Sequence, residues 1–216
     1  MRKLVVGTLL TLDGVMQAPG GPQEDRDGGF EHGGWSVNYW DNTMGKLIVK
    51  QTLEPDALLL GRKTYEIFAA HWPHVTDPND PVATKLNSIR KYVVSRTLGN
   101  VEWNNSSLIS RDVPAAIARL KEESGGQIQV HGSGNLIQTL LKNGLVDEFR
   151  LWVFPVVLGT GKRLFGDGTV PGVLRLIDTK VSTTGVAVHR YERAGRLEYG
   201  SFEVDVAGSS KALWGE

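Results

Sequence analysis

Residues 127–137 constrain the fold more than any other part of the chain. An apolar run breaks there at a glycine-rich turn, residues 131–135, and apolar residues then resume at helical spacing. The pattern predicts a strand that enters a helix through a turn with almost no side-chain bulk. Backbone N–H groups in such a turn, together with the positive end of the helix, can bind a phosphate. Glycine can also serve tight geometry alone, so this motif leaves both interpretations open.

A second strand-to-helix junction lies earlier in the chain. The apolar run 57–60 is followed at once by Gly61, Arg62, Lys63 and Thr64, and then by a helical pattern. Two cations at a helix N-terminus oppose the helix dipole unless an anion is present. We interpret them as evidence for a bound phosphate, although such a pair can also be plain solvated surface.

A third predicted strand, 91–94, ends in Ser95, Arg96 and Thr97, which add two hydroxyls and a guanidinium. Ligands of open α/β sheets collect beyond the carboxyl ends of the strands. Three strand ends with the same chemistry therefore predict one shared site for a ligand that carries several phosphates.

The first half of the chain alternates between strand and helix patterns. Residues 3–12 read as a buried strand that ends at Asp13 and Gly14, and 39–52 as a helix. Between them, residues 17–34 are rich in glycine, proline and charge, which predicts a mobile, irregular loop of the kind that covers functional sites. Asp112 is expected to cap another helix.

From residue 145 the pattern changes to period two. Strands are predicted up to residue 154 and at about 173–181, 185–193 and 197–206, the last three antiparallel. The chain is therefore predicted to be an α/β protein, with a mixed sheet, helices on both faces, β/α units first and hairpins last.

Composition excludes several classes of function. Lys plus Arg and Asp plus Glu each number 24, so nucleic-acid and anionic-membrane partners are not expected, and the absence of cysteine excludes disulfides and a Cys-ligated zinc. Without a signal-peptide pattern or a run of roughly 20 apolar residues, a cytoplasmic location is expected. His71 and His74 have a spacing that suits a metal, but Pro73 intervenes and no third ligand is evident, so no metal site is predicted.

Taken together, the motifs resemble those of the dihydrofolate reductase-like family. They are residues 12–14, 61–65, 93–96 and 132–136. The further runs 144–151 and 155–161 are similar to its riboflavin-pathway branch, the C-terminal pyrimidine reductase domain and its stand-alone relatives. The resemblance covers about residues 2–206. It implies one domain (1–206) with a three-layer sandwich, a mostly parallel central sheet and C-terminal antiparallel strands, followed by a tail (207–216).

The resemblance also implies a cofactor site, and the guanidinium of Arg96 favours NADPH over NADH because it can bind a terminal phosphate bidentately. The implied cofactor-binding residues are Gly14, Gly61, Arg62, Lys63, Thr64, Ser95, Arg96, His131, Gly132, Ser133, Gly134, Asn135 and Leu136. The implied substrate-binding residues are Asp13, Trp40, Asp41 and Phe154.

Three departures from the family limit what is carried over. The glycine pair that forms a cis peptide in dihydrofolate reductases corresponds here to His131-Gly132. The pterin-binding carboxylate of the first helix is missing, since its position falls near Met44 and the nearest acid is Asp41, so folate reduction is not expected. The zinc deaminase half of the bifunctional riboflavin enzyme is absent as well.

The roles of several polar and aromatic residues stay open. Asp13 could donate a proton or could serve only the turn. Asp41 could bind substrate, act as a general acid or stabilise a helix start. Trp40, with Trp35 and Tyr39, could stack on a heterocycle or belong to the core.

The residues and the resemblance together thus predict an NADPH-dependent oxidoreductase that transfers a hydride to a small pyrimidine-like or pterin-like substrate, and the resemblance alone implies a homodimer. The proton would come from water or from Asp13. The alternative is a non-catalytic NADPH- or nucleotide-binding sensor on the same fold.

Overall fold

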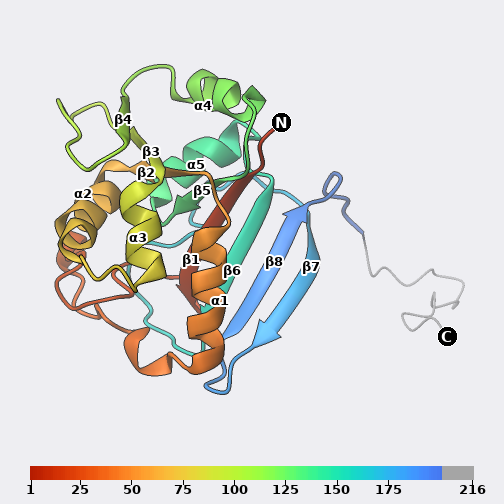
Figure 1. Ribbon diagram of the computed structural model, residues 1–216. Coiled ribbons are helices and arrows are strands. Elements are labelled where there is room, and N and C mark those ends of the chain that lie inside the picture. The colour runs from red at the N-terminus through yellow and green to blue at the C-terminus, as the bar shows by residue number, and fades with distance from the viewer. Residues whose placement is uncertain (201–216) are drawn as a thin grey trace, which may run out of the picture.

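The structure is a computed structural model that describes residues 1–200 of the 216-residue chain. A single sheet runs through it in the strand order β4-β3-β2-β5-β1-β6-β8-β7 (Figure 1). The strands are β1 (Leu4–Thr11), β2 (Ala57–Gly61), β3 (Arg90–Val94), β4 (Ser106–Ile109), β5 (Ile128–His131), β6 (Glu148–Phe154), β7 (Leu174–Val181) and β8 (Ala187–Arg193).

The sheet is parallel from β4 to β6 and antiparallel from β6 to β7. Its central strand is β1, where Val6 lies opposite Val130 of β5 on one side and Phe149 of β6 on the other. This arrangement confirms the prediction of a mixed sheet built by β/α units first and a hairpin last. Because the parallel strands share one direction, their carboxyl ends meet at one edge.

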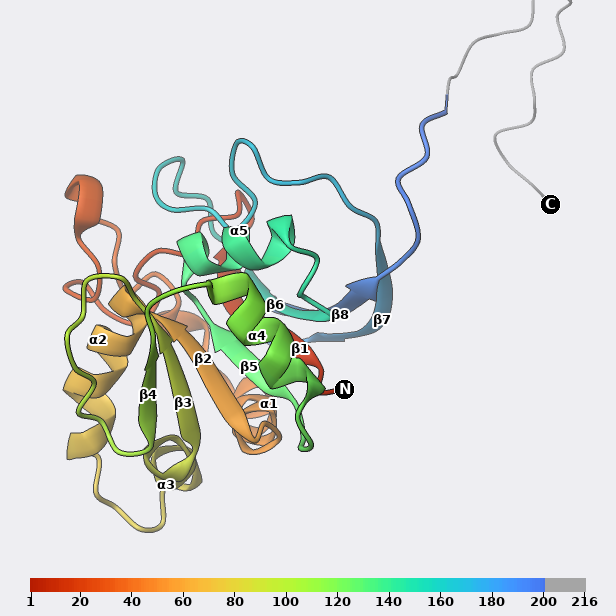
Figure 2. The ribbon, with the colours of Figure 1, turned by 90° about the horizontal axis from the view of Figure 1, so that it is seen from above.

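Helices cover both faces of the sheet, as predicted (Figure 2). Helices α4 (Val113–Glu122) and α5 (Gly134–Lys142) lie on one face, and α1 (Asn42–Leu53), α2 (Arg62–His71) and α3 (Pro81–Ser88) on the other. Three short 3-10 turns complete the set: η1 (Asp27–Gly29), η2 (Val37–Tyr39) and η3 (Trp72–His74).

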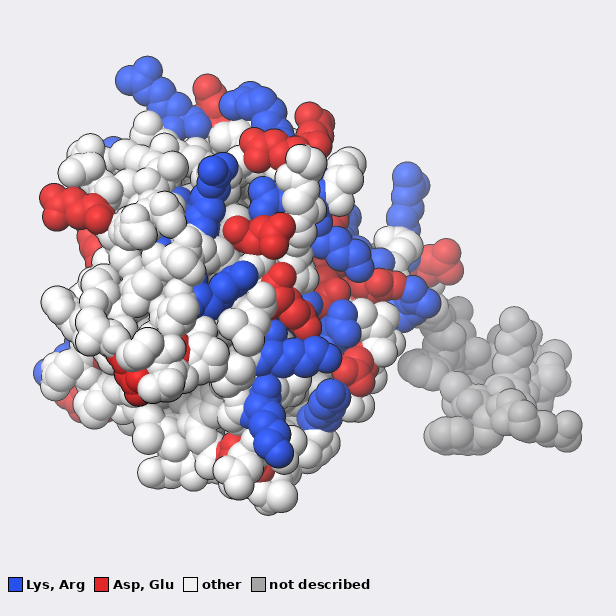
Figure 3. Space-filling model, viewed as in Figure 1, with Lys and Arg blue, Asp and Glu red and all other residues white. Residues whose placement is uncertain are grey.

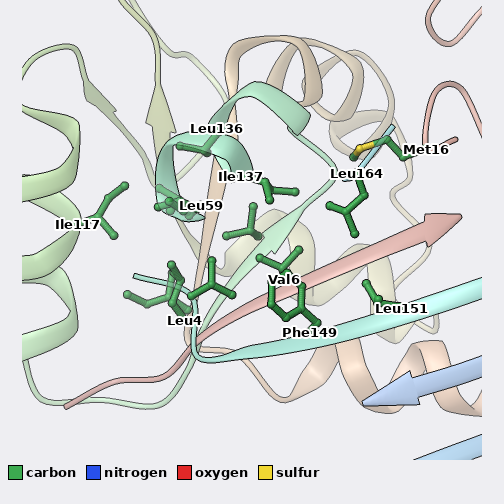
Figure 4. Close-up of a cluster of buried hydrophobic side chains, with 14 of the residues drawn as sticks. Leu4, Val6, Met16, Leu59, Ile117, Leu136, Ile137, Phe149, Leu151 and Leu164 are labelled. Atoms are coloured by element: carbon green, nitrogen blue, oxygen red, sulfur yellow. The ribbon is translucent and has the colours of Figure 1, made fainter. Parts of the chain in front are cut away.

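Because successive side chains of a strand point to opposite faces, each face of the sheet has its own layer of apolar side chains. On the α4–α5 face, Val6 and Phe149 pack against Ile137 of α5 and Ile117 of α4 (Figure 4). On the other face, Leu58 and Leu60 pack under α2 and α3, while Trp152 and Phe154 pack under Met44 of α1. These layers hold the helix starts and the strand ends in fixed relative positions.

The glycine-rich segment 17–34 is irregular, as predicted, but it is tied down. Phe30 is buried with Val15 and Ala18, and the Gln17 side-chain amide donates to the carbonyl oxygens of Asp25 and Asp27. A second loop, residues 155–173, lies against it, and Gly161 there is close-packed: a Cβ atom at that position would lie 2.7 Å from Val15 Cγ1 and 2.8 Å from the Phe30 ring.

Several expectations about individual elements need correction. Asp112 precedes α4 but has a left-handed backbone, and its side chain caps no N–H group. Residues 197–200 form no strand, and the remainder of the predicted strand 197–206, like the predicted tail 207–216, lies outside the described residues. Helix α3 and strand β4 were not predicted. Within residues 1–200, no helix has the length and apolar character to cross a bilayer.

Positive and negative side chains are interspersed over the face that carries α1, β6, β8 and β7 (Figure 3). Near the start of β6, Arg150 donates to Glu148 at 2.9 Å and to Glu54 at 2.6 Å, and Arg190 donates to Glu148 at 3.1 Å. Although its burial opposes ionisation, the two guanidinium groups lower the pKa of Glu148. The mixture of signs gives this face no extended positive field of the kind that attracts nucleic acid.

Candidate functional site

The carboxyl ends of β1, β2, β3, β5 and β6 bring the predicted site residues to one edge of the sheet. Asp13 and Gly14 follow β1, Arg62 begins α2 directly after β2, and Ser95 follows β3. The turn 132–134 follows β5. Segments that are far apart in the chain therefore frame one edge, which is where open α/β sheets bind ligands.

The starts of α2 and α5 are joined through Ser133. The Gly61 N–H donates to Ser133 Oγ at 2.9 Å, and Ser133 Oγ lies 2.9 Å from Thr64 Oγ1 and 3.1 Å from the carbonyl oxygen of His131. Ser133 has a left-handed backbone with φ of 66°. The hydroxyl that the sequence assigned to the cofactor is thus held by neighbours within the protein.

Both helix starts at this junction lack a capping side chain. No side chain accepts a hydrogen bond at the N-terminus of α2 or α5, and neither first turn contains an acidic residue. By contrast, Asp41 caps α1 and Asp80 caps α3. Uncapped backbone N–H groups at the positive end of a helix dipole can hydrogen-bond to a phosphate.

The cations at the start of α2 already have anionic partners within the protein. Lys63 Nζ lies 2.9 Å from Asp27 Oδ1 and 3.8 Å from Asp25 Oδ1, and Lys162 Nζ lies 2.6 Å and 2.8 Å from the same two carboxylates. Hydrogen bonds from Lys162 and Lys63 lower the pKa of Asp27 to about 2. The expectation that these cations require an external anion is therefore wrong for Lys63. The sheet edge nonetheless presents two exposed guanidinium groups, those of Arg62 and Arg96.

At the end of β3, Ser95 and Arg96 have different environments. Ser95 is buried, and its hydroxyl accepts hydrogen bonds from the N–H groups of Thr97 and Leu98. It therefore shapes the turn that carries Arg96, whose side chain is exposed.

Asp13 is anchored by the end of β1 and by the loop after β6. Its carboxylate accepts hydrogen bonds from Thr11 Oγ1 at 2.6 Å, from the N–H groups of Leu158 and Gly159, and from Arg163 at 3.3 Å. The Thr11 hydroxyl, with the two backbone donors, lowers the pKa of Asp13 to about 2. Asp13 is ionised at neutral pH, so of its two predicted roles the geometry favours the turn over the proton donor.

The residues predicted to bind substrate form an aromatic cluster over the end of β6. Phe154 is completely buried beneath Trp35, Tyr39 and Trp40, which makes it a packing residue rather than a contact surface. Trp40 is 37% exposed and packs on Trp152, with 5.6 Å between the ring centroids. The cluster joins the start of α1 to the core; Trp40 is exposed, Trp35 and Tyr39 are half-buried, and Phe154 is buried.

Asp41 has the helix-start role among the three that were considered. Its carboxylate accepts from the Met44 N–H at 2.8 Å and from both the N–H and the hydroxyl of Thr183. The Thr183 hydroxyl, followed by the Met44 N–H, lowers the pKa of Asp41.

His131 occupies the last position of β5, with its imidazole beside the ring of Phe68 at 5.8 Å. Burial lowers the pKa of His131 to about 4, and its Nε2 atom is buried without a hydrogen-bond partner. The ring is therefore neutral. The peptide bond between His131 and Gly132 is trans, unlike the cis bond of dihydrofolate reductases.

A cavity of about 850 Å³ lies away from this edge, between α2, α3 and residues 100–104. Tyr65, Trp103 and Asn87 are among its lining residues, and none of the predicted cofactor residues lines it. Its volume alone would favour this cavity as the ligand site, but the helix starts and cations at the sheet edge favour that edge as the site. No group of three or more His, Cys, Asp or Glu side chains suited to a metal ion occurs in residues 1–200.

Sequence reasoning missed Asp25, Asp27, Lys162 and Arg163 as parts of the site. Asp25 and Asp27 lie in segment 17–34, which was predicted only as a mobile, irregular loop of the kind that covers functional sites, and Lys162 and Arg163 follow the run 155–161 without a prediction of their own. The signal available was the presence of isolated charges of opposite sign in two such segments, and local patterns cannot show that these segments meet.

Known proteins resemble this chain in sequence and in fold. The model of the RibD C-terminal domain matches residues 2–189. The uncharacterized protein YyaP of Bacillus subtilis (strain 168) is 32% identical over 187 residues, which is 86% of this chain and 92% of YyaP.

Solved structures share the fold at low identity. A protein of Shewanella sp. PV-4 named for a proposed role in riboflavin biosynthesis has a TM-score of 0.66 at 22% identity, covering 89% of this chain and 99% of its own. The Thermotoga maritima diaminohydroxyphosphoribosylaminopyrimidine deaminase/5-amino-6-(5-phosphoribosylamino)uracil reductase has a TM-score of 0.59 at 13% identity, covering 89% and 57%.

Dihydrofolate reductase from Enterococcus faecalis, complexed with NADP(H), has a TM-score of 0.56 at 14% identity, covering 89% of this chain and 97% of its own. These likenesses confirm the predicted dihydrofolate reductase-like fold.

Proposed function

Because this chain belongs to the RibD C-terminal domain family, we propose that it is an NADPH-dependent reductase that transfers a hydride to a small heterocyclic substrate, pyrimidine-like or pterin-like. The observation that carries the proposal is that two uncapped helix starts and the exposed residues Arg62 and Arg96 follow strands whose carboxyl ends lie at one edge of the sheet. Two of the structural neighbours are reductases, and one of them is complexed with NADP(H).

The residues present fit a dinucleotide. Gly132 and Gly134 keep the turn before α5 free of side-chain bulk: a Cβ atom at Gly132 would lie 3.3 Å from Thr64 Oγ1, and one at Gly134 would lie 3.5 Å from Met16 Sδ. The N–H groups of Gly134 and Asn135, with Arg62, Lys63 and Thr64, would hold the diphosphate. Arg96 would hold the 2′-phosphate through its planar fork of donors.

The bound nicotinamide supplies the hydride, so the protein needs no nucleophile of its own. Its task is to orient the two reactants and exclude water. The ionised Asp13 anchors the loop after β6 against the turn after β1, and the exposed Trp40, packed on Trp152 at the start of α1, would contact the substrate. The proton is supplied by water, because the pKa of Asp13 is about 2.

A second copy of the chain is the proposed protein partner. Strand β7 forms one edge of the sheet, and Leu176, Ile177 and Val181 on it are exposed. An edge strand with exposed apolar side chains is suited to pairing with another strand.

The test begins with binding of NADPH and NADH, followed by NADPH oxidation in the presence of pyrimidine, pterin and flavin compounds. We expect NADPH to bind more tightly and at least one compound to be reduced. Tight binding without oxidation by any compound would favour the sensor alternative. Failure to bind either dinucleotide would contradict both functions.

The variant Arg96→Ala tests the assignment of the 2′-phosphate. Loss of a charge-assisted, bidentate contact should weaken NADPH binding by about 10-fold to 100-fold and leave NADH binding unchanged. Arg119→Ala, an exposed arginine on α4, serves as the matched control. Equal losses for the two dinucleotides would show that the assignment of Arg96 is wrong.

A further inference from the structure

The Ser133 hydroxyl has more hydrogen-bonding neighbours than it can satisfy as a donor. Its oxygen is within 2.9–3.1 Å of a donor, the Gly61 N–H, of a second hydroxyl, that of Thr64, and of an acceptor, the carbonyl oxygen of His131. A hydroxyl carries one proton, so Ser133 can donate to Thr64 or to His131 but not to both. The cluster therefore has two proton arrangements over the same heavy atoms.

The two arrangements differ in what Thr64 can offer to a ligand. When Ser133 donates to His131, Thr64 donates to Ser133 and has only lone pairs left for other partners. When Ser133 donates to Thr64, the Thr64 proton is free to bind an acceptor outside the cluster. An anionic oxygen at the start of α2 stabilises the second arrangement, since hydrogen bonds to charged acceptors are stronger than those to neutral ones.

We propose that Ser133 is a positioning residue, which orients the Thr64 hydroxyl proton toward the diphosphate of the bound dinucleotide without contacting the cofactor itself. The inference rests on the proposed function, and it differs from the prediction that Ser133 binds the cofactor directly. The left-handed backbone of Ser133 places its side chain between the two helix starts. Gly61 allows this approach, because a Cβ atom there would lie 3.2 Å from Ser133 Cβ.

The proposal predicts that loss of the Ser133 hydroxyl weakens the contact with the diphosphate and not the contact with the 2′-phosphate. Thr64 lies in the first turn of α2, whereas Arg96 follows β3, so different residues make the diphosphate contact and the 2′-phosphate contact. Loss of the Ser133 hydroxyl should therefore weaken NADPH and NADH by the same factor, in contrast to Arg96→Ala.

A double-mutant cycle tests the coupling. We expect Thr64→Ala to weaken both dinucleotides about tenfold, as for one charge-assisted hydrogen bond, and Ser133→Ala to weaken them several-fold. The double variant should bind no more weakly than Thr64→Ala alone. Ser133→Gly removes the same hydroxyl while relieving the left-handed backbone, so it should reproduce the loss of affinity even if Ser133→Ala is poorly folded.

Ser88→Ala is the matched control, because its hydroxyl contacts only carbonyl oxygens within α3. It should leave both affinities unchanged. The proposal is overturned if Ser133→Gly binds like the wild type, if the Ser133 and Thr64 effects add fully, or if NADPH alone is affected. If the wild-type protein binds neither dinucleotide, the proposed function fails and this inference fails with it.

Discussion

At the scale of single residues, the buried imidazole of His131 should make stability depend on pH. Its pKa is about 4 in the folded protein against an ordinary value of 6.5, so between these values the unfolded chain binds a proton that the folded chain does not. The free energy of unfolding should therefore decrease as pH falls from 6.5 to 4, by about 3 kcal/mol at most.

Urea unfolding across this pH range measures the effect. In His131→Leu the side chain cannot titrate, so the free energy of unfolding should depend less on pH between 4 and 6.5. His74→Leu, at an exposed position, should keep the pH dependence of the wild type. An identical slope in the wild type and His131→Leu would contradict the burial of the ring.

Asp13 should lower stability in the same direction, as pH falls, but in a more acidic range. Its folded pKa of about 2 lies below the ordinary value of 3.8, so its stabilising effect is complete above 3.8 and disappears as pH falls toward 2. Asp13→Asn should lower the melting temperature at pH 7 and have much less effect at pH 2. If Asp13 were instead the proton donor, kcat would lose its dependence on pH in this variant while stability stayed unchanged.

At the scale of elements, the contact between residues 15–30 and the loop 155–173 depends on Gly161. Its φ is 118°, and an added Cβ would overlap both Val15 and Phe30, so Gly161→Ala should lower the free energy of unfolding by about 2–4 kcal/mol. Gly159→Ala is the control, because Gly159 also has positive φ, 78°, but has nothing within 4 Å of the added atom. It should cost only about 1 kcal/mol. Equal losses in urea unfolding would contradict the close packing.

The same loop contact should compete with phosphate for Lys63. Asp27→Asn removes the nearer carboxylate, so NADPH affinity should rise about twofold to fivefold at low salt. The gain should shrink at high ionic strength, where charges are screened. Asp77→Asn, near the far cavity, should change nothing. A fall in affinity for Asp27→Asn would show that Asp27 supports the site rather than competing with the ligand.

Much of this arrangement could be predicted from the sequence, and the limits have physical causes. Apolar periodicity predicts most of the strands and helices in their order. The strand ends at residues 61–64, 95–96 and 131–135 are predicted as one site because small, hydroxyl-bearing or cationic residues directly follow each strand in the sequence. Helix α3 has only eight residues, too few for a clear periodic signal. The partners of Lys63 and Ser133 lie 36 and 72 residues away, and local patterns contain no information on such contacts.

At the scale of the whole molecule, the β7 edge predicts self-association. Leu176→Arg should convert the proposed dimer to a monomer, because it replaces an apolar side chain of the edge strand, 48% exposed, with a charge. Leu53→Arg, also on an exposed apolar residue but at the end of α1, is the control. Light scattering after size-exclusion chromatography distinguishes the two states. A wild-type protein that stays monomeric at high concentration would contradict the proposal.

The central place of β1 has a consequence for biosynthesis. β1 is synthesised well before its two neighbours, β5 and β6, which end at residues 131 and 154. At roughly 5–20 residues per second, the apolar segment Leu4–Thr11 waits several seconds or longer for its partners. During translation this segment is therefore a natural target for chaperones, and the sheet edge at the carboxyl ends of β1, β5 and β6 cannot assemble until residue 154 has been made.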